Sequence, residues 1–298
     1  MIRIKTRTSN RFVGFTLVEL LVVIAIIGVL VGMSVPAMQN MREMSRRSHC
    51  EQNLTQLSLG LAAYSLRHGY YPAGTINDQG PIQSEPSGYH HNWVSSLLPH
   101  LDAANVYDAI DFNVGVYDPA NEPARMVRIP TLLCPSASNV RDYTSCYAGI
   151  HASEETPIDE DNDGVFILNR RLDDRDIADG LGYTLFLAEK LSPFDEDLGW
   201  MSGTRSTLRN TGHAINDERS RVYAPASEVQ PVTAEYVGGI ARDHPGGAYL
   251  LLGGGEIQFR SVSIDSLILT QMAARADKAI PKEWQSKQQV ADDLAEEE

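Results

Sequence analysis

The chain has 298 residues, of which 43% are hydrophobic, and its formal net charge is −14. This length and composition are sufficient for a packed domain. The negative charge argues against nucleic acid as a partner, because nucleic acids are bound by clustered lysine and arginine. Three cysteines, Cys50, Cys134 and Cys146, are too few for a disulfide scaffold, and none belongs to a CxxC pair. Composition alone leaves their pairing open.

The N-terminal segment combines positive charge with a long apolar run. Four basic residues precede Gly14, and residues 15–32 are apolar apart from Thr16 and Glu19. Extended to residue 38, the run is long enough to cross a bilayer as a helix, and no small-residue cleavage site follows it. Basic residues before such a run place the N-terminus in the cytoplasm. We therefore expect a single membrane helix over residues 15–38.

Glu19 is the unusual residue of this segment. An ionised carboxylate inside a membrane helix costs about 2.5 kcal/mol or more, so we expect Glu19 to have a partner or a function. A plain anchor that is never processed is the alternative, but such an anchor needs no acid at this position.

Residues 14–28, GFTLVELLVVIAIIG, closely resemble the class III signal of type IV prepilins and type II secretion pseudopilins. The resemblance implies that a prepilin peptidase cleaves after Gly14 and methylates the new N-terminus at Phe15. It also implies that Glu19 neutralises the terminal amino group of a neighbouring pilin-like subunit during assembly. Residues 1–14 are then a leader, and the protein is held in the inner membrane with its C-terminal domain outside the cytoplasm.

Beyond the membrane segment, apolar residues recur at steps of three and four from Leu54 to Tyr64. This spacing predicts an amphipathic continuation of the helix over residues 39–70. Gly69 is expected to end the helix, and Pro72 prevents it from resuming.

Short segments separated by glycine, proline, asparagine and aspartate follow residue 71, as is typical of strands and loops. The expected strands are residues 164–168, 183–189, 248–252 and 256–262, and the expected short helices are residues 103–110 and 263–277. The last two strands flank three glycines and are expected to pair as a hairpin.

The predicted fold class is therefore α+β and pilin-like. The long helix packs on a mainly antiparallel, β-rich domain with long loops, over residues 71–280. An acidic tail, residues 281–298, lacks the apolar residues needed to offset chain entropy and is expected to be disordered.

An ordered series of motifs resembles the DUF1559 family of pilin-like proteins, which is abundant in planctomycetes. The matching segments are residues 50–54, 71–74, 93–101, 133–136, 163–166, 176–180, Thr184, Glu189 and 244–248. In that family the last segment, here His244, Gly246 and Gly247, opens an H-x9-DG motif. Gly254 and Gly255 stand where the Asp-Gly of the motif would be. The resemblance implies an envelope protein of undetermined activity.

Asp159, Asp161 and Asp163 alternate ahead of Gly164, a spacing that can present several oxygens to calcium. The twelfth position of the loop is Arg170, whereas an EF-hand has a bidentate glutamate there. A complete EF-hand is therefore excluded. A shorter calcium loop and a solvated acidic turn are the two interpretations.

The sequence contains no GxSxG, HExxH, Walker or GxGxxG motif, so we expect a protein that is not an enzyme. His244 precedes a proline and two glycines, which predicts a turn histidine in preference to a catalytic one. For Cys50 and Cys134, a disulfide that clamps the helix to the sheet and a pair of buried free thiols are both open.

Two functional hypotheses follow. The first is a structural subunit, pseudopilin-like or minor-pilin-like, that packs with other pilin-like helices. The second is a glycan- or solute-binding module that uses the N-terminal helix as an anchor.

Overall fold

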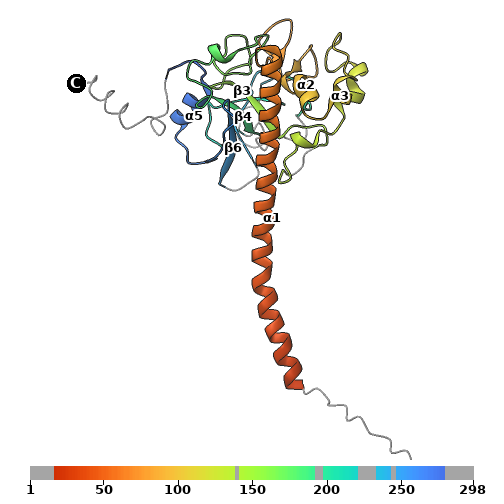
Figure 1. Cartoon of the computed structure of the whole chain (residues 1–298), viewed down its shortest axis with the longest axis vertical. Coiled ribbons are helices and arrows are strands. Elements are labelled where there is room, and N and C mark those ends of the chain that lie inside the picture. Colours follow the sequence, from red (N-terminus) through yellow and green to blue (C-terminus); the bar gives the residue numbers. More distant parts are fainter. Residues whose placement is uncertain (1–16, 138–140, 192–196, 221–232, 243–245, 279–298) are drawn as a thin grey trace, which may run out of the picture. The chain divides into compact units, whose positions relative to one another are not determined.

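The computed structural model describes residues 17–137, 141–191, 197–220, 233–242 and 246–278 (Figure 1). Gly14, Phe15, His244 and the tail over residues 281–298 lie outside the described residues, as do the side chains of residues 35–37 and 40. The chain divides into two compact units, Met1–Ser45 and Arg46–Glu298.

Helix α1 spans Leu17–His68. Within the first unit, its residues Leu17–Ser34 have a mean hydropathy of 2.7, and none of them is buried. A helix satisfies its own backbone hydrogen bonds, which is the requirement for crossing lipid, and this segment meets the length and composition of a membrane span. The apolar run therefore forms the helix expected for a single-pass anchor.

In the second unit, α1 presents an apolar stripe to the domain interior. Cys50, Leu54, Leu57 and Leu61 are at most 3% exposed and are spaced at four, three and four residues. The helix ends at His68, and Gly69 follows with a φ of +82°. The Gly69 amide donates to the Ser65 carbonyl at 2.7 Å, as expected for a glycine that closes a helix in the left-handed region. The predicted end of the helix is confirmed.

A five-stranded sheet with the order β5-β3-β4-β6-β7 forms the core of the second unit. All neighbouring strands are antiparallel except β3 and β5, which are parallel. The strands are β3 (Tyr147–Ala152), β4 (Leu185–Glu189), β5 (Leu208–Asn210), β6 (Gly247–Leu252) and β7 (Ile257–Ser261). A separate antiparallel pair consists of β1 (Thr75–Ile76) and β2 (His91–Asn92).

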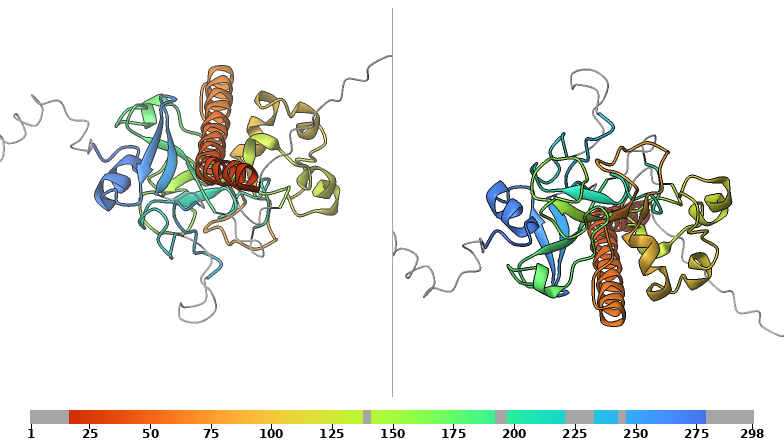
Figure 2. Two further views of the ribbon diagram at one scale, coloured as in Figure 1. Left: turned by 90° about the horizontal axis from the view of Figure 1, so that it is seen from below. Right: turned by 90° about the horizontal axis from the view of Figure 1, so that it is seen from above.

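Short helices complete the second unit: α2 (Trp93–Leu97), α3 (Ala104–Tyr107), α4 (Glu122–Arg125) and α5 (Ser266–Ala273). Single 3-10 turns are η1 (Leu98–His100), η2 (Pro119–Asn121), η3 (Pro130–Leu132) and η4 (Asp174–Asp176). Within this unit, α5 and the pair of α2 and α3 lie on opposite sides of α1 (Figure 2).

Two apolar clusters hold these elements together. The larger one joins the stripe of α1 to Trp93, Phe166 and Phe186. The smaller one joins Ile150 of β3 and Leu250 of β6 to residues of α5. Because alternate residues of a strand point to opposite faces, the sheet contributes to both clusters. The architecture is α+β, as predicted.

Strands β4 and β7 and helices α3 and α5 lie within the predicted ranges. Strand β6 begins one residue before its predicted range and pairs with β7 as expected. The predicted strand over residues 164–168 is wrong. The amides of Gly164, Val165 and Phe166 donate to only two carbonyls, those of Ile150 and His151, so they form no regular ladder. Strands β3 and β5 and helix α2 were not predicted.

Candidate functional site

Glu19 lies in the first turn of α1, two residues after the helix begins. Its neighbours are exposed apolar side chains, with Leu17 at 79%, Val18 at 68% and Leu20 at 56% exposure. A negative charge near a helix N-terminus interacts favourably with the helix dipole. The structure therefore places one acid near the end of an apolar surface.

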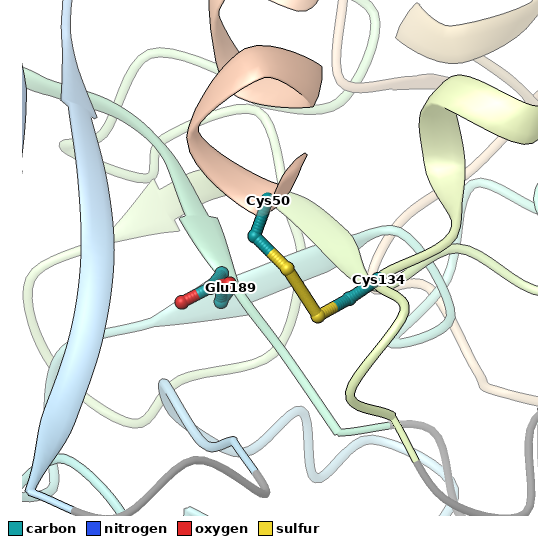
Figure 3. A group of neighbouring side chains, drawn as sticks. All are labelled: Cys50, Cys134 and Glu189. Atoms are coloured by element: carbon teal, nitrogen blue, oxygen red, sulfur yellow. A yellow bond between two sulfur atoms is a disulfide. The ribbon is translucent and has the colours of Figure 1, made fainter. Parts of the chain in front are cut away.

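A disulfide joins Cys50 of α1 to Cys134, which follows η3 (Figure 3). The two Cα atoms are 5.4 Å apart, and the cysteines are separated by 84 positions in the sequence. Both residues are buried, at 0% and 7% exposure. The third cysteine, Cys146, is a buried free thiol, and burial raises its pKa to about 11. A thiol with such a pKa is almost entirely protonated at neutral pH and is therefore unreactive.

Glu189 lies beside this disulfide at the end of β4 (Figure 3). Side-chain ligand atoms of Cys50, Cys134 and Glu189 all lie within 4.8 Å of one another, the only grouping of three or more potential metal ligands among the described residues. While the two sulfur atoms are bonded to each other, neither supplies the thiolate that a metal ion needs. The geometry therefore favours a covalent link over a metal centre.

Arg242 pairs with Glu189 in the interior. Its Nη1 lies 2.7 Å from Glu189 Oε2, and each side chain is 3% exposed. The Tyr249 amide donates to the same carboxylate oxygen at 2.7 Å, and the Arg242 guanidinium lies 5.2 Å from the centre of the Tyr249 ring. Burial raises the pKa of Glu189 to about 7, although Arg242 and the Tyr249 amide act in the opposite direction. Burial also lowers the pKa of Arg242.

A second buried ion pair, between Lys190 and Asp197, lies next along the chain. The Lys190 Nζ and Asp197 Oδ2 atoms are 2.8 Å apart, and the side chains are 0% and 1% exposed. The Lys190 amide donates to the Cys146 carbonyl at 2.9 Å. The family resemblance includes Glu189 but assigns it no role. The ion pair of Lys190 with Asp197 was not predicted from the sequence.

The three acidic residues of the predicted calcium loop are not brought together as ligands. Asp163 accepts hydrogen bonds from the amide and hydroxyl of Ser153, at 2.8 and 2.5 Å. Asp159 accepts from the amide of Glu160, and its own amide donates to Asn162. These bonds organise a polar turn, and calcium binding by Asp159, Asp161 and Asp163 stays a prediction without a formed site.

The glycines of the predicted family motif shape the hairpin of β6 and β7. Gly246 and Gly255 have φ angles of +93° and +90°, a region that favours glycine. At Gly247 an added Cβ would lie 2.0 Å from the Arg260 carbonyl oxygen on β7. Since Gly255 closes the turn with its amide 2.9 Å from the Leu252 carbonyl, these glycines have a structural role. The turn needs no aspartate at position 254.

Together, one apolar N-terminal helix and an α+β domain fit a single-pass, membrane-anchored protein of the prepilin-like class. Residues 14–35 match the prokaryotic N-terminal methylation motif. Residues 39–267 match the family described as protein of unknown function (DUF1559). The chain belongs to the DUF1559 family.

A curated relative is similar to part of this chain. The type II secretion system core protein G of Pectobacterium carotovorum subsp. carotovorum is 33% identical over 94 residues. The match covers 29% of this chain and 58% of the relative. The chain thus spans little more than half of that protein's length. No solved structure gives a significant match.

Proposed function

We propose that the protein is a non-enzymatic, pilin-like subunit of the cell envelope. A prepilin peptidase cleaves it after Gly14 and methylates Phe15. Residues 15–38 anchor it in the inner membrane, with the N-terminus cytoplasmic and the domain beyond residue 70 outside the cytoplasm. There it assembles with other pilin-like subunits, in a structure of the type II secretion or type IV pilus kind.

The observation that carries the proposal is the position of Glu19. It lies in the first turn of an apolar, exposed helix, inside the segment that matches the methylation motif. A carboxylate in lipid costs about 2.5 kcal/mol or more unless it is compensated. The methylated amino group of Phe15 on a neighbouring subunit is a cation at the same depth of the membrane, and it would supply that compensation.

The apolar surface of α1 supports the same assembly. Its side chains from Leu17 to Met33 are exposed in the isolated chain, including Ile24 at 59% and Leu30 at 59%. In a membrane this surface contacts lipid or other helices, and helix association in lipid depends on close packing and polar pairs. A single acid near the end of the surface then fixes the register between neighbours.

Substitution of Glu19 tests the proposal. We expect Glu19→Ala to be cleaved and methylated normally but to lose most of its co-purification with other pilin-type proteins after cross-linking in cells. Glu43→Ala is the matched control, because Glu43 is a partly buried acid on the same helix outside the apolar run, and it should co-purify normally. Unchanged co-purification of Glu19→Ala would rule out assembly through this residue.

A further inference from the structure

A pocket of about 380 Å³ opens between the end of α1 and the segment that runs from β1 to the loop after α3. All of its lining belongs to the unit Arg46–Glu298. The volume falls within the range of small-ligand sites. The pocket is separate from the disulfide and from Glu189, and the proposed assembly does not use it.

Aromatic rings form two walls of this pocket. On one wall the centre of the Tyr64 ring lies 4.3 Å from the centre of the His68 ring and 6.2 Å from the centre of the His100 ring. On the other wall the centre of the Phe112 ring lies 4.9 Å from the centre of the His91 ring and 5.1 Å from the centre of the Tyr107 ring. Tyr64 is 9% exposed and His91 is 2% exposed. Because each ring is held by its neighbours, the walls are formed before any ligand arrives.

The charge of the lining is opposite to that of the chain as a whole. The chain has 39 acidic and 25 basic residues, yet the lining contains Arg67, Arg171, three histidines and no aspartate or glutamate. Asp111 acts electrostatically on His91 but is not part of the lining. The pocket is therefore a local concentration of cationic and neutral donor groups, which favours an anionic ligand.

Arg171 is held at this pocket by Tyr70. Its guanidinium lies 5.1 Å from the centre of the Tyr70 ring, and Nη1 donates to the Tyr70 hydroxyl at 3.2 Å. A guanidinium fixed in this way keeps further N–H groups in a planar arrangement that matches a carboxylate. Burial lowers the pKa of His100, and Arg67 and His68 act in the same direction. All three residues line this pocket, so their side chains can act on one ligand.

We propose that this pocket binds an acidic sugar unit of a polysaccharide, with the sugar carboxylate on Arg171 and Arg67 and the ring against Tyr64 and Tyr107. Aromatic side chains provide rigid, flat surfaces with polar edges, which suit the faces and hydroxyls of a pyranose. The polar groups that Tyr64, Tyr107 and His100 present here are side-chain hydroxyls and an imidazole. The site gives the domain an affinity for anionic glycan that does not depend on filament assembly.

Isothermal titration of the full chain in detergent tests this site. The probes are short oligomers of galacturonate, of mannuronate and of a glucuronate-containing glycan. We expect at least one of them to bind. Its methyl ester keeps every ring and hydroxyl but loses the charge, and should bind with an affinity at least about tenfold lower. Failure of all three probes, or equal binding of acid and ester, would overturn the proposal.

Variants locate the binding. Arg171→Gln removes an exposed guanidinium, so we expect the fold to be kept and the affinity to fall about tenfold. Tyr107→Ala should weaken the binding of the acid and of its ester to the same extent. Arg128→Gln is the control, because Arg128 is an exposed arginine outside this pocket that pairs with Asp142 at 2.8 Å. Unchanged affinity in Arg171→Gln would exclude this pocket, and equally tight binding of hexaglutamate would assign it to acidic peptides.

Discussion

The carboxylate of Glu189 and the guanidinium of Arg242 are 2.7 Å apart in the domain interior, with 3% of each side chain exposed. Glu189 also lies beside the disulfide that links Cys50 of α1 to Cys134. One buried polar cluster therefore brings together the end of β4, the start of the packed part of α1 and the segment before β6. Loss of one partner of such a pair leaves an uncompensated charge in the interior.

The first prediction concerns the pH dependence that Glu189 creates. In the folded protein its pKa is raised from 4.5 to about 7. Between pH 4.5 and about 7 the folded protein therefore keeps a proton that the unfolded chain has released. By linkage, the contribution of Glu189 to stability falls as the pH rises from 4.5 to about 7, by up to about 1.4 kcal/mol per pH unit. Urea unfolding of the wild type and of Glu189→Gln from pH 4 to pH 8 measures the difference.

The difference in unfolding free energy between wild type and Glu189→Gln should decline from pH 4.5 to about 7 and stay level at higher pH. A difference in unfolding free energy that is flat from pH 4 to pH 8 would show that the pKa of Glu189 is the same in both states.

The second prediction concerns the disulfide. Under denaturing, non-reducing conditions we expect one reactive thiol per chain, from Cys146, and three after reduction. Cys146→Ser should remove the single thiol. Cys134→Ser should lower the free energy of unfolding by about 2–4 kcal/mol, because the bond closes a long loop in the unfolded chain. Three thiols before reduction would instead support the alternative of buried free cysteines.

The third prediction compares two glycines. At Gly247 an added Cβ would lie 2.0 Å from the Arg260 carbonyl oxygen, whereas at Gly182 it would meet nothing within 4 Å. Gly247→Ala should therefore lower the melting temperature, at a cost of about 1–3 kcal/mol or more. Gly182→Ala should leave it unchanged or slightly raised. Equal melting temperatures for the two variants would contradict the close approach of β6 and β7.

The fourth prediction compares two leucines on α1. Leu57 is 0% exposed in the larger apolar cluster, whereas Leu59 is 65% exposed. Leu57→Ala should lower the free energy of unfolding by about 2–5 kcal/mol, and Leu59→Ala should change it by about 0.5 kcal/mol or less. Chemical unfolding of the full chain in detergent gives both values. A larger loss for Leu59→Ala would place the other face of the helix against the domain.

The sequence predicted the elements whose determinants are local. Gly69 ends α1 because it adopts the left-handed region directly after the last helical turn. The glycines after β6 allow the hairpin with β7. In each case a few neighbouring residues decide the structure, and their types can be recognised without knowledge of the rest of the chain.

Strand β3 could not be predicted in this way. Its residues Tyr147–Ala152 include two alanines, a glycine and a histidine in place of an apolar run. Gly149 is required because an added Cβ would lie 2.7 Å from the Phe166 ring, and the buried His151 bonds to Asn162 at 3.0 Å. These residues suit the strand only because of what packs against them, and that information is not local.

The candidate sites depend on the same long-range contacts. Arg242 and Glu189 come from distant segments, as do Cys50 and Cys134, and only the fold brings each pair together. The pocket likewise combines Tyr64 of α1 with Phe112 and Arg171. The N-terminal signal is different, because its residues act in one short linear segment, and the match over residues 14–35 follows from sequence alone.

The central claim is that the chain is processed and anchored as a pilin-like protein. Intact-mass and N-terminal peptide analysis of protein extracted from membranes tests it most directly. We predict a chain that begins at Phe15 and carries one methyl group on its amino nitrogen. A chain that still begins at Met1 in the membrane fraction would contradict this account.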